Sequence, residues 1–363
     1  MIIKNLKLLN NIHLTKKHPV SLIHFVTNRC NARCSFCFID FDNPDVFKGE
    51  LSLDEIEKLS KTLGPSIQNI NLTGGEPFAR SDLLEIAKIY FKNTLIRSLY
   101  VTSNGSLPKR VKAFISGLAD EFSNRKLFLS YSIDDFPERH DEIRKIKGLF
   151  SCAIESYQIA KSFAPFVESN IQITISPENY QRADLIYEEL IRKYQVKSIT
   201  IVLARDEGIF KLPLAMKNKL LKVYKELTEK LLIDQKTGRI FGFSNSTIQG
   251  RVMNRKNEIV YDKVAQTYLD NKFLSYCQAG SLFGVIEANG DIKPCEILDK
   301  VVGNLRDFDY NFMSIWDSQS NKINKDWIKD TKCNCSYECA WSFNVLADIK
   351  HQPDLLVAAL NFN

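Results

Sequence analysis

Short apolar runs of strand length alternate with amphipathic helical stretches between residues 20 and 205, and this rhythm limits the fold more than any other feature of the chain. Repeated strand–helix units predict an α/β fold, in which a parallel sheet carries helices on its outer face. Six such units are too few for a closed eight-stranded barrel. We expect strands at residues 21–27, 67–72, 98–102, 127–133, 171–175 and 198–203, and helices at 53–63, 82–92, 108–122, 151–163 and 182–194, with Ser52 and Ser81 as N-caps.

The pattern changes after residue 210. Two long charged helical stretches, at 211–232 and 248–269, are expected to pack across the barrel as a bridge or lid. From Cys277 onward, the apolar run 282–288, the turn Asn289-Gly290 and residues 291–294 predict a β-hairpin, and residues 340–363 are expected to be helical. The chain therefore divides into a barrel-forming domain (1–209), a helical bridge or lid (210–272) and a small cysteine-rich α+β extension (273–363).

Composition and charge exclude several classes of protein. Lys and Arg number 49 against 43 Asp and Glu, a net charge of +6 that is scattered along the chain, so neither a nucleic-acid nor a membrane partner is indicated. Residues 1–11 lack the apolar core of a signal peptide, and no apolar stretch is long enough to span a membrane. We therefore expect a cytoplasmic protein. Disulfides are the weaker interpretation of the nine cysteines, because their number is odd and eight of them have ligand-like spacing.

Three cysteines in one short loop point to a metal centre. Cys30, Cys34 and Cys37 are separated by three and then two residues, a spacing that differs from the CxxC pair of a redox dithiol or a zinc knuckle. Three thiolates on a four-iron cubane leave one iron open to a small molecule. The alternative is a structural zinc site.

The surrounding residues strengthen this interpretation. The cysteine loop follows the first expected strand, and the second strand ends in Thr73-Gly74-Gly75-Glu76-Pro77. Together the CxxxCxFC and GGEP segments resemble the radical S-adenosylmethionine (radical SAM) superfamily. The resemblance implies a partial (β/α)6 TIM-like barrel, which agrees with six strands. It also implies that Cys30, Cys34 and Cys37 ligate a [4Fe-4S] cluster whose open iron binds S-adenosylmethionine.

The activity that this resemblance implies is reductive. An electron, supplied by a donor such as flavodoxin or ferredoxin, cleaves S-adenosylmethionine, and the resulting 5′-deoxyadenosyl radical removes a hydrogen atom from a substrate. The protein positions the substrate and excludes competing reactions. No Ser-His-Asp or HExxH arrangement suggests other chemistry, and the five histidines are dispersed.

Candidate cosubstrate-binding residues lie where the expected strands end, since parallel α/β folds bind ligands at that edge. The glycines allow close approach of the backbone to a ligand, and the resemblance implies that their segment hydrogen-bonds the methionine amino group. The polar side chains are expected to hold the ribose hydroxyls and the carboxylate. For the Asn104-Gly105 and Asp134-Asp135 pairs the alternative is an ordinary turn or helix cap, and for Phe36, expected near the adenine, it is loop packing. The set is Phe36, Gly74, Gly75, Glu76, Pro77, Ser103, Asn104, Ser130, Ser132, Asp134 and Arg205.

A second group of cysteines occupies the carboxyl end of the chain. It resembles the SPASM and twitch extensions of the same superfamily, which carry auxiliary [4Fe-4S] clusters. A full SPASM unit has seven or more cysteines, so the resemblance implies one auxiliary cluster here. We expect Cys277, Cys295, Cys335 and Cys339 as its ligands, with Cys333 as the substitute. The alternative is a zinc knuckle, and Cys152, which stands alone, is expected to be a packing residue.

These features predict an oxidative enzyme, because an auxiliary cluster can accept an electron from a substrate radical. The first strand begins near residue 21, so we expect no peptide-recognition domain before it. This favours dehydrogenation of, or bond formation in, a small molecule such as a sugar or amino alcohol. A ribosomally made peptide remains the alternative substrate, and a non-catalytic iron-sulfur electron carrier is the alternative outside enzymes.

Overall fold

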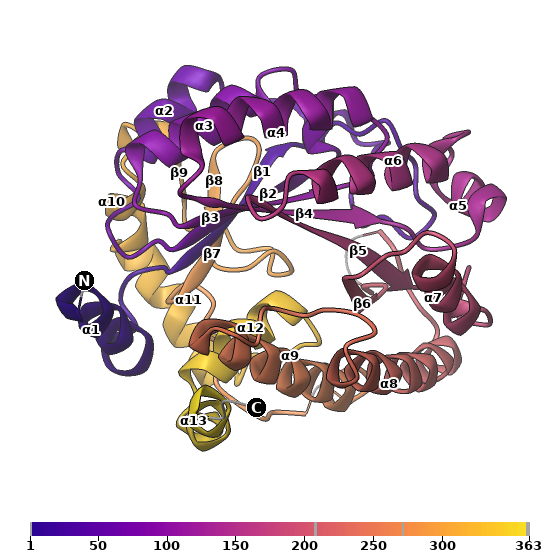
Figure 1. Ribbon diagram of the computed structural model, residues 1–363. Helices are drawn as coiled ribbons and strands as arrows, with labels where there is room; N and C mark the ends of the chain where they lie inside the picture. Colours follow the sequence, from indigo (N-terminus) through magenta and orange to yellow (C-terminus); the bar gives the residue numbers. More distant parts are fainter. Residues whose placement is uncertain (1, 207–208, 271, 361–363) are drawn as a thin grey trace.

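One mixed sheet organises the chain, and Figure 1 shows it surrounded by helices. The computed structural model describes residues 2–206, 209–270 and 272–360. Within them, the strand order is β6-β5-β4-β3-β2-β1-β7-β8-β9. The six strands predicted from the sequence are present in order as β1 (Ser21–Thr27), β2 (Asn69–Gly74), β3 (Ser98–Ser103), β4 (Lys126–Ser132), β5 (Val167–Ile175) and β6 (Ile199–Leu203).

The predicted α/β class and the partial barrel are confirmed. Neighbouring strands from β1 to β6 all pair in parallel. The two ends of the strand order, β6 and β9, do not pair with each other, so the sheet stays open. Its outer face is covered by α2 (Leu53–Ser60), α3 (Leu83–Asn93), α4 (Pro108–Phe122), α5 (Pro137–Arg144), α6 (Leu149–Ser162) and α7 (Ala183–Arg192).

Local signals explain where some of these helices begin. Ser52 caps α2 as predicted: its side chain accepts a hydrogen bond from the Glu55 backbone, and the Glu55 carboxylate accepts one from the Ser52 backbone, the reciprocal pair of a capping box. The second predicted cap, Ser81, is wrong. Asp82 holds the N-cap position of α3 without a side-chain capping bond. Helix α5 was not predicted, because it is short and strongly polar.

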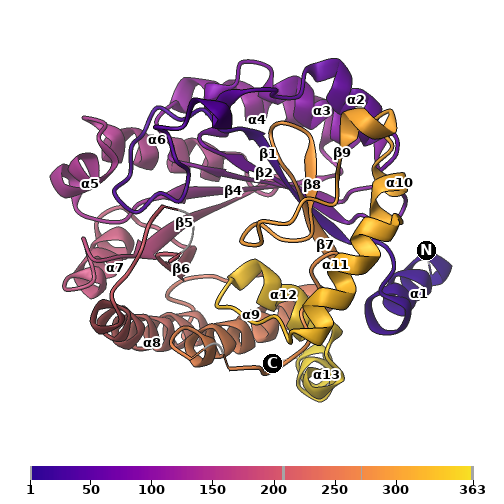
Figure 2. The same cartoon turned by 180° about the vertical axis from the view of Figure 1, so that it is seen from behind.

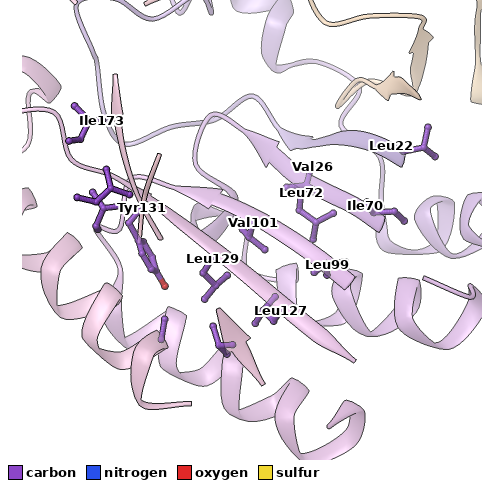
Figure 3. Packing of buried hydrophobic residues seen from close by; sticks show 14 of the residues in the cluster. Leu22, Val26, Ile70, Leu72, Leu99, Val101, Leu127, Leu129, Tyr131 and Ile173 are labelled. Atoms are coloured by element: carbon purple, nitrogen blue, oxygen red, sulfur yellow. The ribbon is translucent and has the colours of Figure 1, made fainter. Parts of the chain in front are cut away.

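Alternation along the strands sorts side chains between the two faces of the sheet. Leu99 and Val101 of β3, with Leu127 and Leu129 of β4, are fully buried against the outer helices, and Figure 3 shows them on that side of the sheet. Burial of each such side chain contributes roughly 1.5–3 kcal/mol. The intervening residues of both strands face the barrel interior, where the Tyr100 and Phe128 rings stack with centroids 4.4 Å apart.

Two long helices connect the barrel to the carboxyl-terminal part of the chain. Helix α8 (Leu214–Lys236) packs against β6, and α9 (Ile248–Thr267) packs beside α8 and against α12 (Glu338–Ala347) and α13 (Gln352–Leu360). Figure 1 shows α8 and α9 following one another along the rim of the molecule. The division into three domains stays a prediction.

The carboxyl-terminal segment extends the barrel sheet, which was not predicted. The predicted hairpin is present as β7 (Phe283–Ile286) and β8 (Asp291–Lys293), which pair antiparallel, with β9 (Gly303–Asn304) beside β8. Strand β7 also pairs in parallel with β1. This pairing satisfies backbone groups that would otherwise line an exposed edge of β1.

The remaining helices lie beside this extended edge of the sheet. They are α10 (Phe312–Trp316) and α11 (Gln319–Asp330), which Figure 2 shows next to β7 and β8, and α1 (Ile2–Asn10) at the amino terminus. Helices α12 and α13 confirm the helical prediction for residues 340–363 as far as residue 360, and residues 361–363 lie outside the described part of the chain. Among the described helices, none combines the length and apolar character needed to cross a membrane.

Candidate cofactor cavity and second cysteine cluster

A cavity opens at the carboxyl ends of β2 to β6, next to the loop that follows β1. All three cysteines of that loop line it. The loop is held in part by its own turn, in which the Cys37 backbone N–H donates to the Cys34 carbonyl at 3.1 Å. The sequence prediction that these thiols and the strand ends meet at one site therefore agrees with the arrangement of the chain.

The three thiols are suited to a metal cluster. Burial raises the pKa of all three, that of Cys30 to about 12, so they are protonated at neutral pH until a metal displaces the protons. Among the described residues, no three His, Cys, Asp or Glu side chains converge on a single ion. Three thiols on the wall of one cavity are a donor set that fits a [4Fe-4S] cluster with one iron left open.

The glycines of the GGEP segment pack against the backbone that enters the cysteine loop. A Cβ on Gly74 would lie 1.9 Å from the Thr27 carbonyl oxygen, and one on Gly75 would lie 2.3 Å from that of Arg29. The Gly75 N–H donates to the Thr27 carbonyl and the Glu76 N–H to that of Arg29, both at 2.9 Å. Both glycines also line the cavity. The close contact between the two backbone segments is thus one reason for glycine at positions 74 and 75. The other is the expected close approach of the backbone to a ligand in the cavity.

Glu76 organises the neighbouring strand end from a fully buried position. One carboxylate oxygen accepts hydrogen bonds from the Phe78 backbone at 2.9 Å and the Ser103 hydroxyl at 2.8 Å, and the other accepts from the Asn104 backbone at 2.7 Å. Burial raises the pKa of Glu76. Ser103 and Asn104 line the cavity, whereas Glu76 and Pro77 are buried and do not.

Asn104 connects this network to the cysteine loop. Its side-chain amide donates to the Asn31 side chain at 2.9 Å and lies 3.9 Å from the Cys30 sulfur. The hydrogen bond between Asn104 and Asn31 therefore fixes the end of β3 relative to the cysteine loop, and Asn104 itself lines the cavity.

The residues predicted at the end of β4 separate into three environments. Ser132 lines the cavity, whereas Ser130 lies deeper in the barrel and accepts a hydrogen bond from Asn170 at 3.0 Å. Asp134 is fully buried and pairs with Arg144 at 2.7 Å. Asp134 thus orients a cation that itself lines the cavity, and Phe36 lies beside that cation, with the guanidinium carbon 5.9 Å from the ring centroid.

Arg205 lines the opposite part of the cavity and is already paired. Its guanidinium binds the Glu296 carboxylate at 2.7 Å and lies over the rings of Phe38 and Tyr337, at 4.4 and 5.2 Å from their centroids. The other Glu296 oxygen accepts a hydrogen bond from the Tyr337 hydroxyl. Glu296 lines the cavity too, so these three side chains connect it with the carboxyl-terminal segment.

The five carboxyl-terminal cysteines gather around one apolar cluster. Cys295 is buried within it, and the other four pack against it. Burial raises the pKa of Cys277 to about 12 and that of Cys339 to about 11, and the charges of Cys277 and Cys335 both act on Cys295. The cysteines are thus within electrostatic range of one another. Which four would ligate a cluster stays a prediction.

Arg144 and Glu296 are cavity residues that the sequence interpretation missed. Arg144 ends α5, the helix that hydrophobic periodicity did not reveal. Glu296 had a signal, since it directly follows a candidate ligand, Cys295. Gln172 and Thr174 of β5 also line the cavity and were missed, although alternation along that strand places them on one face.

Comparison with known proteins agrees with the site. The model of the Radical SAM superfamily matches residues 25–190, which include the cysteine loop and the ends of β2 to β5 around the cavity. A GTP 3',8-cyclase from Yersinia pestis is 42% identical over 81 residues, which are 22% of this chain and 25% of that protein. A relative from Methanothermobacter thermautotrophicus, named "Probable GTP 3',8-cyclase", is 31% identical over 149 residues, 40% of this chain and 48% of its own. The chain therefore spans a quarter to half the length of these curated relatives.

Solved structures share the fold across most of the chain. "Native anSMEcpe with bound AdoMet" has a TM-score of 0.59 at 20% identity and covers 94% of this chain and 100% of its own. Streptococcus suis SuiB, bound to the precursor peptide SuiA, has a TM-score of 0.57 at 16% identity and covers 89% of this chain and 70% of its own. The similarity extends past the matched domain into the carboxyl-terminal segment. With the cysteine loop, the open parallel barrel and the matching model, residues 25–190 form a domain of the radical SAM superfamily, whose members bind a [4Fe-4S] cluster and S-adenosylmethionine.

Proposed function

We propose that the chain is a radical SAM oxidoreductase that removes two hydrogens from a small-molecule substrate held in the cavity. Cys30, Cys34 and Cys37 would hold the amino-terminal cluster, and four of the five carboxyl-terminal cysteines would hold an auxiliary [4Fe-4S] cluster in a SPASM- or twitch-like extension. When bound, the first cluster and S-adenosylmethionine supply the removal of one hydrogen atom, and the auxiliary cluster supplies an acceptor for one electron. A donor such as flavodoxin or ferredoxin in a reducing cytoplasm would provide the initial electron.

The protein's own groups bind the cosubstrate in this proposal. Arg144 is a buried cation beside the cysteines, and its guanidinium is held by Asp134, so it suits a carboxylate at the edge of the cavity. Ser103, Asn104 and Ser132 offer hydroxyl and amide groups for a ribose. Arg205 was expected to bind the cosubstrate carboxylate, but it is engaged by Glu296. Arg144 is paired as well, with Asp134, so pairing alone does not separate the two arginines. We assign that carboxylate to Arg144 because its charge acts on Cys34 of the amino-terminal cysteine loop.

The observation that carries the oxidative proposal is the position of Glu296. Loss of one hydrogen atom and one electron leaves a proton to be removed from the substrate, and the product is then two hydrogens poorer. Glu296 is a carboxylate on the cavity wall, directly after Cys295; it is paired with Arg205 and accepts a hydrogen bond from the Tyr337 hydroxyl. We propose that it accepts that proton as a general base, with Arg205 and Tyr337 holding it in position.

Charge in the cavity argues against a nucleoside triphosphate, the kind of substrate that the names of the curated relatives suggest. The two cavity cations, Arg144 and Arg205, are each neutralised by a carboxylate at 2.7 Å. A triphosphate needs several uncompensated cations or a metal ion. A sugar or amino alcohol needs hydrogen bonds, and Gln172, Thr174 and Ser132 supply them from the cavity wall.

A peptide is the second candidate substrate. The fold likeness to SuiB bound to its precursor peptide covers most of this chain, and so does the likeness to a structure of anSMEcpe that contains a peptide. A serine or threonine side chain of a peptide carries the same hydroxyl group as a small alcohol. The substrate assay must therefore include both classes.

The test uses anaerobically reconstituted protein with S-adenosylmethionine, a reductant and panels of sugars, amino alcohols and peptides. We expect 5′-deoxyadenosine and a product lighter by two hydrogens. Glu296→Gln should lower product formation by about 10²-fold or more while 5′-deoxyadenosine still forms, since general bases contribute roughly 10²–10⁴-fold. Glu287→Gln, which removes a partly exposed carboxylate paired with Lys293 outside the cavity lining, is the control and should retain product formation.

Three outcomes would contradict the proposal. Wild-type product formation in Glu296→Gln would remove Glu296 from the reaction. A product at the redox level of the substrate would exclude the oxidation. Absence of 5′-deoxyadenosine with every substrate would favour a non-catalytic iron-sulfur carrier.

A further inference from the structure

A buried lysine lies beside the carboxyl-terminal cysteines and has no role in the proposed reaction. Lys256, on α9, is only 6% exposed. Its ammonium donates to the Ser342 hydroxyl at 3.2 Å. In the described part of the chain it forms no ion pair with a carboxylate, and the titratable group that acts on it is Cys339, whose thiolate would raise the pKa of Lys256.

The helix that carries Ser342 also carries Cys339. The two residues are three positions apart on α12, so they lie on the same face of that helix. Because α9 packs against α12, the Lys256 ammonium is directed at the face from which Cys339 projects. A cation buried without a carboxylate is unfavourable, and burial lowers the pKa of Lys256 to about 8, whereas a charged Cys339 acts in the opposite direction. Among the described residues, the negative charge that acts on Lys256 is that of Cys339 when its thiol is ionised.

Other polar groups around these cysteines differ from Lys256. Asn344 and Tyr337 contact Cys277 and Cys339 through neutral hydrogen bonds. The cation of Arg205 also acts on Cys339, but it is already paired with Glu296. Glu338 adds a negative charge near Cys339 and makes contacts of its own. Within the part of the chain that the structure describes, Lys256 is therefore a buried cation near this site that pairs with no carboxylate.

We propose that Lys256 is a positioning residue that raises the reduction potential of the auxiliary cluster, and so makes that cluster a better acceptor of the substrate's electron. The inference rests on the proposed auxiliary cluster. Reduction adds negative charge to a cluster, and a nearby buried cation stabilises the reduced form; net charge and hydrogen bonding are established determinants of cluster potential. The helical segment between the barrel and the extension thereby contributes to the redox chemistry of the extension.

The test isolates the auxiliary cluster in a chain carrying Cys30→Ala, Cys34→Ala and Cys37→Ala. Its midpoint potential is measured by EPR-monitored redox titration in that background and after adding Lys256→Met, Lys256→Gln or Lys256→Arg. We expect the two neutral variants to shift the midpoint to more negative values and the arginine variant to stay near the parent. Lys263→Met is the matched control: it lies two turns along α9 and is paired with Asp262, so its removal should leave the midpoint unchanged.

The outcomes separate this inference from the function on which it rests. A cysteine-substituted parent that binds about four irons, with unshifted midpoints in both neutral variants, overturns the role of Lys256 alone. A parent that binds no iron overturns the auxiliary cluster itself. Equal shifts in Lys256→Met and in Lys263→Met would mean that any charge on α9 acts in the same way, which also overturns the specific role.

Discussion

Gly75 shows how one residue fixes the geometry of the amino-terminal site. The chain leaving β1 and the chain leaving β2 approach so closely that an ideal Cβ on Gly75 meets three backbone atoms of Asn28 and Arg29 within 2.7 Å. A backbone atom cannot rotate away as a side chain can. Any larger residue must therefore displace the start of the cysteine loop.

We predict that Gly75→Ala lowers the free energy of unfolding by about 1–3 kcal/mol, as overpacking does, and abolishes binding of the amino-terminal cluster. Iron analysis of the reconstituted protein should show about four irons fewer per chain. Gly238→Ala is the control: its φ of +75° strains alanine, but nothing lies within 4 Å of the added Cβ, so iron content should not change. Full iron content in Gly75→Ala would contradict this reading of the segment.

At the residue scale, the sequence was sufficient for groups whose chemistry is local. Cys30, Cys34 and Cys37 lie within eight residues, so their spacing alone predicts a shared site, and they do line one cavity. Arg144 and Glu296 reach that cavity only through long-range packing, which no local pattern encodes. Asp134 was predicted as a ligand contact, yet in the structure it holds Arg144.

At the scale of elements, two of the contacts that fasten the carboxyl-terminal segment to the barrel lie at β1 and α2. One is the pairing of β7 with β1. The other is Glu55 of α2, which accepts hydrogen bonds from Arg306 at 2.7 and 3.1 Å and from the Tyr310 hydroxyl at 2.8 Å. Burial acts to raise the pKa of Glu55, but these bonds and those from Ser52 outweigh it and lower that pKa to about 2.

We predict that Glu55→Gln lowers the free energy of unfolding of the metal-free chain by about 1–3 kcal/mol at pH 7, the range for hydrogen bonds to charged groups. Glutamine keeps the capping box, so the loss reports the contacts to Arg306 and Tyr310. Because the folded pKa is depressed, the ionised carboxylate contributes fully above about pH 4.5, and its contribution disappears as the pH falls toward 2.

Urea unfolding of both chains at pH 7 and pH 3.5 checks this prediction: the difference between them should narrow at the lower pH. Glu57→Gln on the same helix is the control, since that carboxylate is exposed and forms a surface ion pair with Lys61, and no measurable change is expected. A difference that is constant or grows in acid would show that the charge of Glu55 is not the cause.

Elements with strong periodicity were predictable, and those fixed by distant partners were not. Strand β1 and helix α4 have the predicted bounds, because an apolar run and a proline at the helix start define them locally. The polar helix α5 lacks an amphipathic pattern. The hairpin β7–β8 was predicted, but its pairing with β1 was not. That pairing joins residues 21–24 to residues 283–286, which are more than 250 positions apart in the chain.

At the scale of the whole molecule, two cysteine sites lie at one end of an open barrel. The cavity contains the first site, and the Arg205–Glu296–Tyr337 group connects that cavity with the second. The open sheet makes this arrangement possible, because its free edges accept β7 on one side and α8 on the other. A substrate in the cavity would thus lie between a site that starts the reaction and a site that completes it.

The central claim is that the amino-terminal thiolates leave one iron open for S-adenosylmethionine. EPR spectroscopy of the reduced, anaerobically reconstituted protein, recorded with and without S-adenosylmethionine, tests this claim most directly. We expect a [4Fe-4S] signal that changes when S-adenosylmethionine is added, and loss of that change in the chain carrying Cys30→Ala, Cys34→Ala and Cys37→Ala. A signal that S-adenosylmethionine leaves unaltered, or zinc in place of iron at these cysteines, would contradict it.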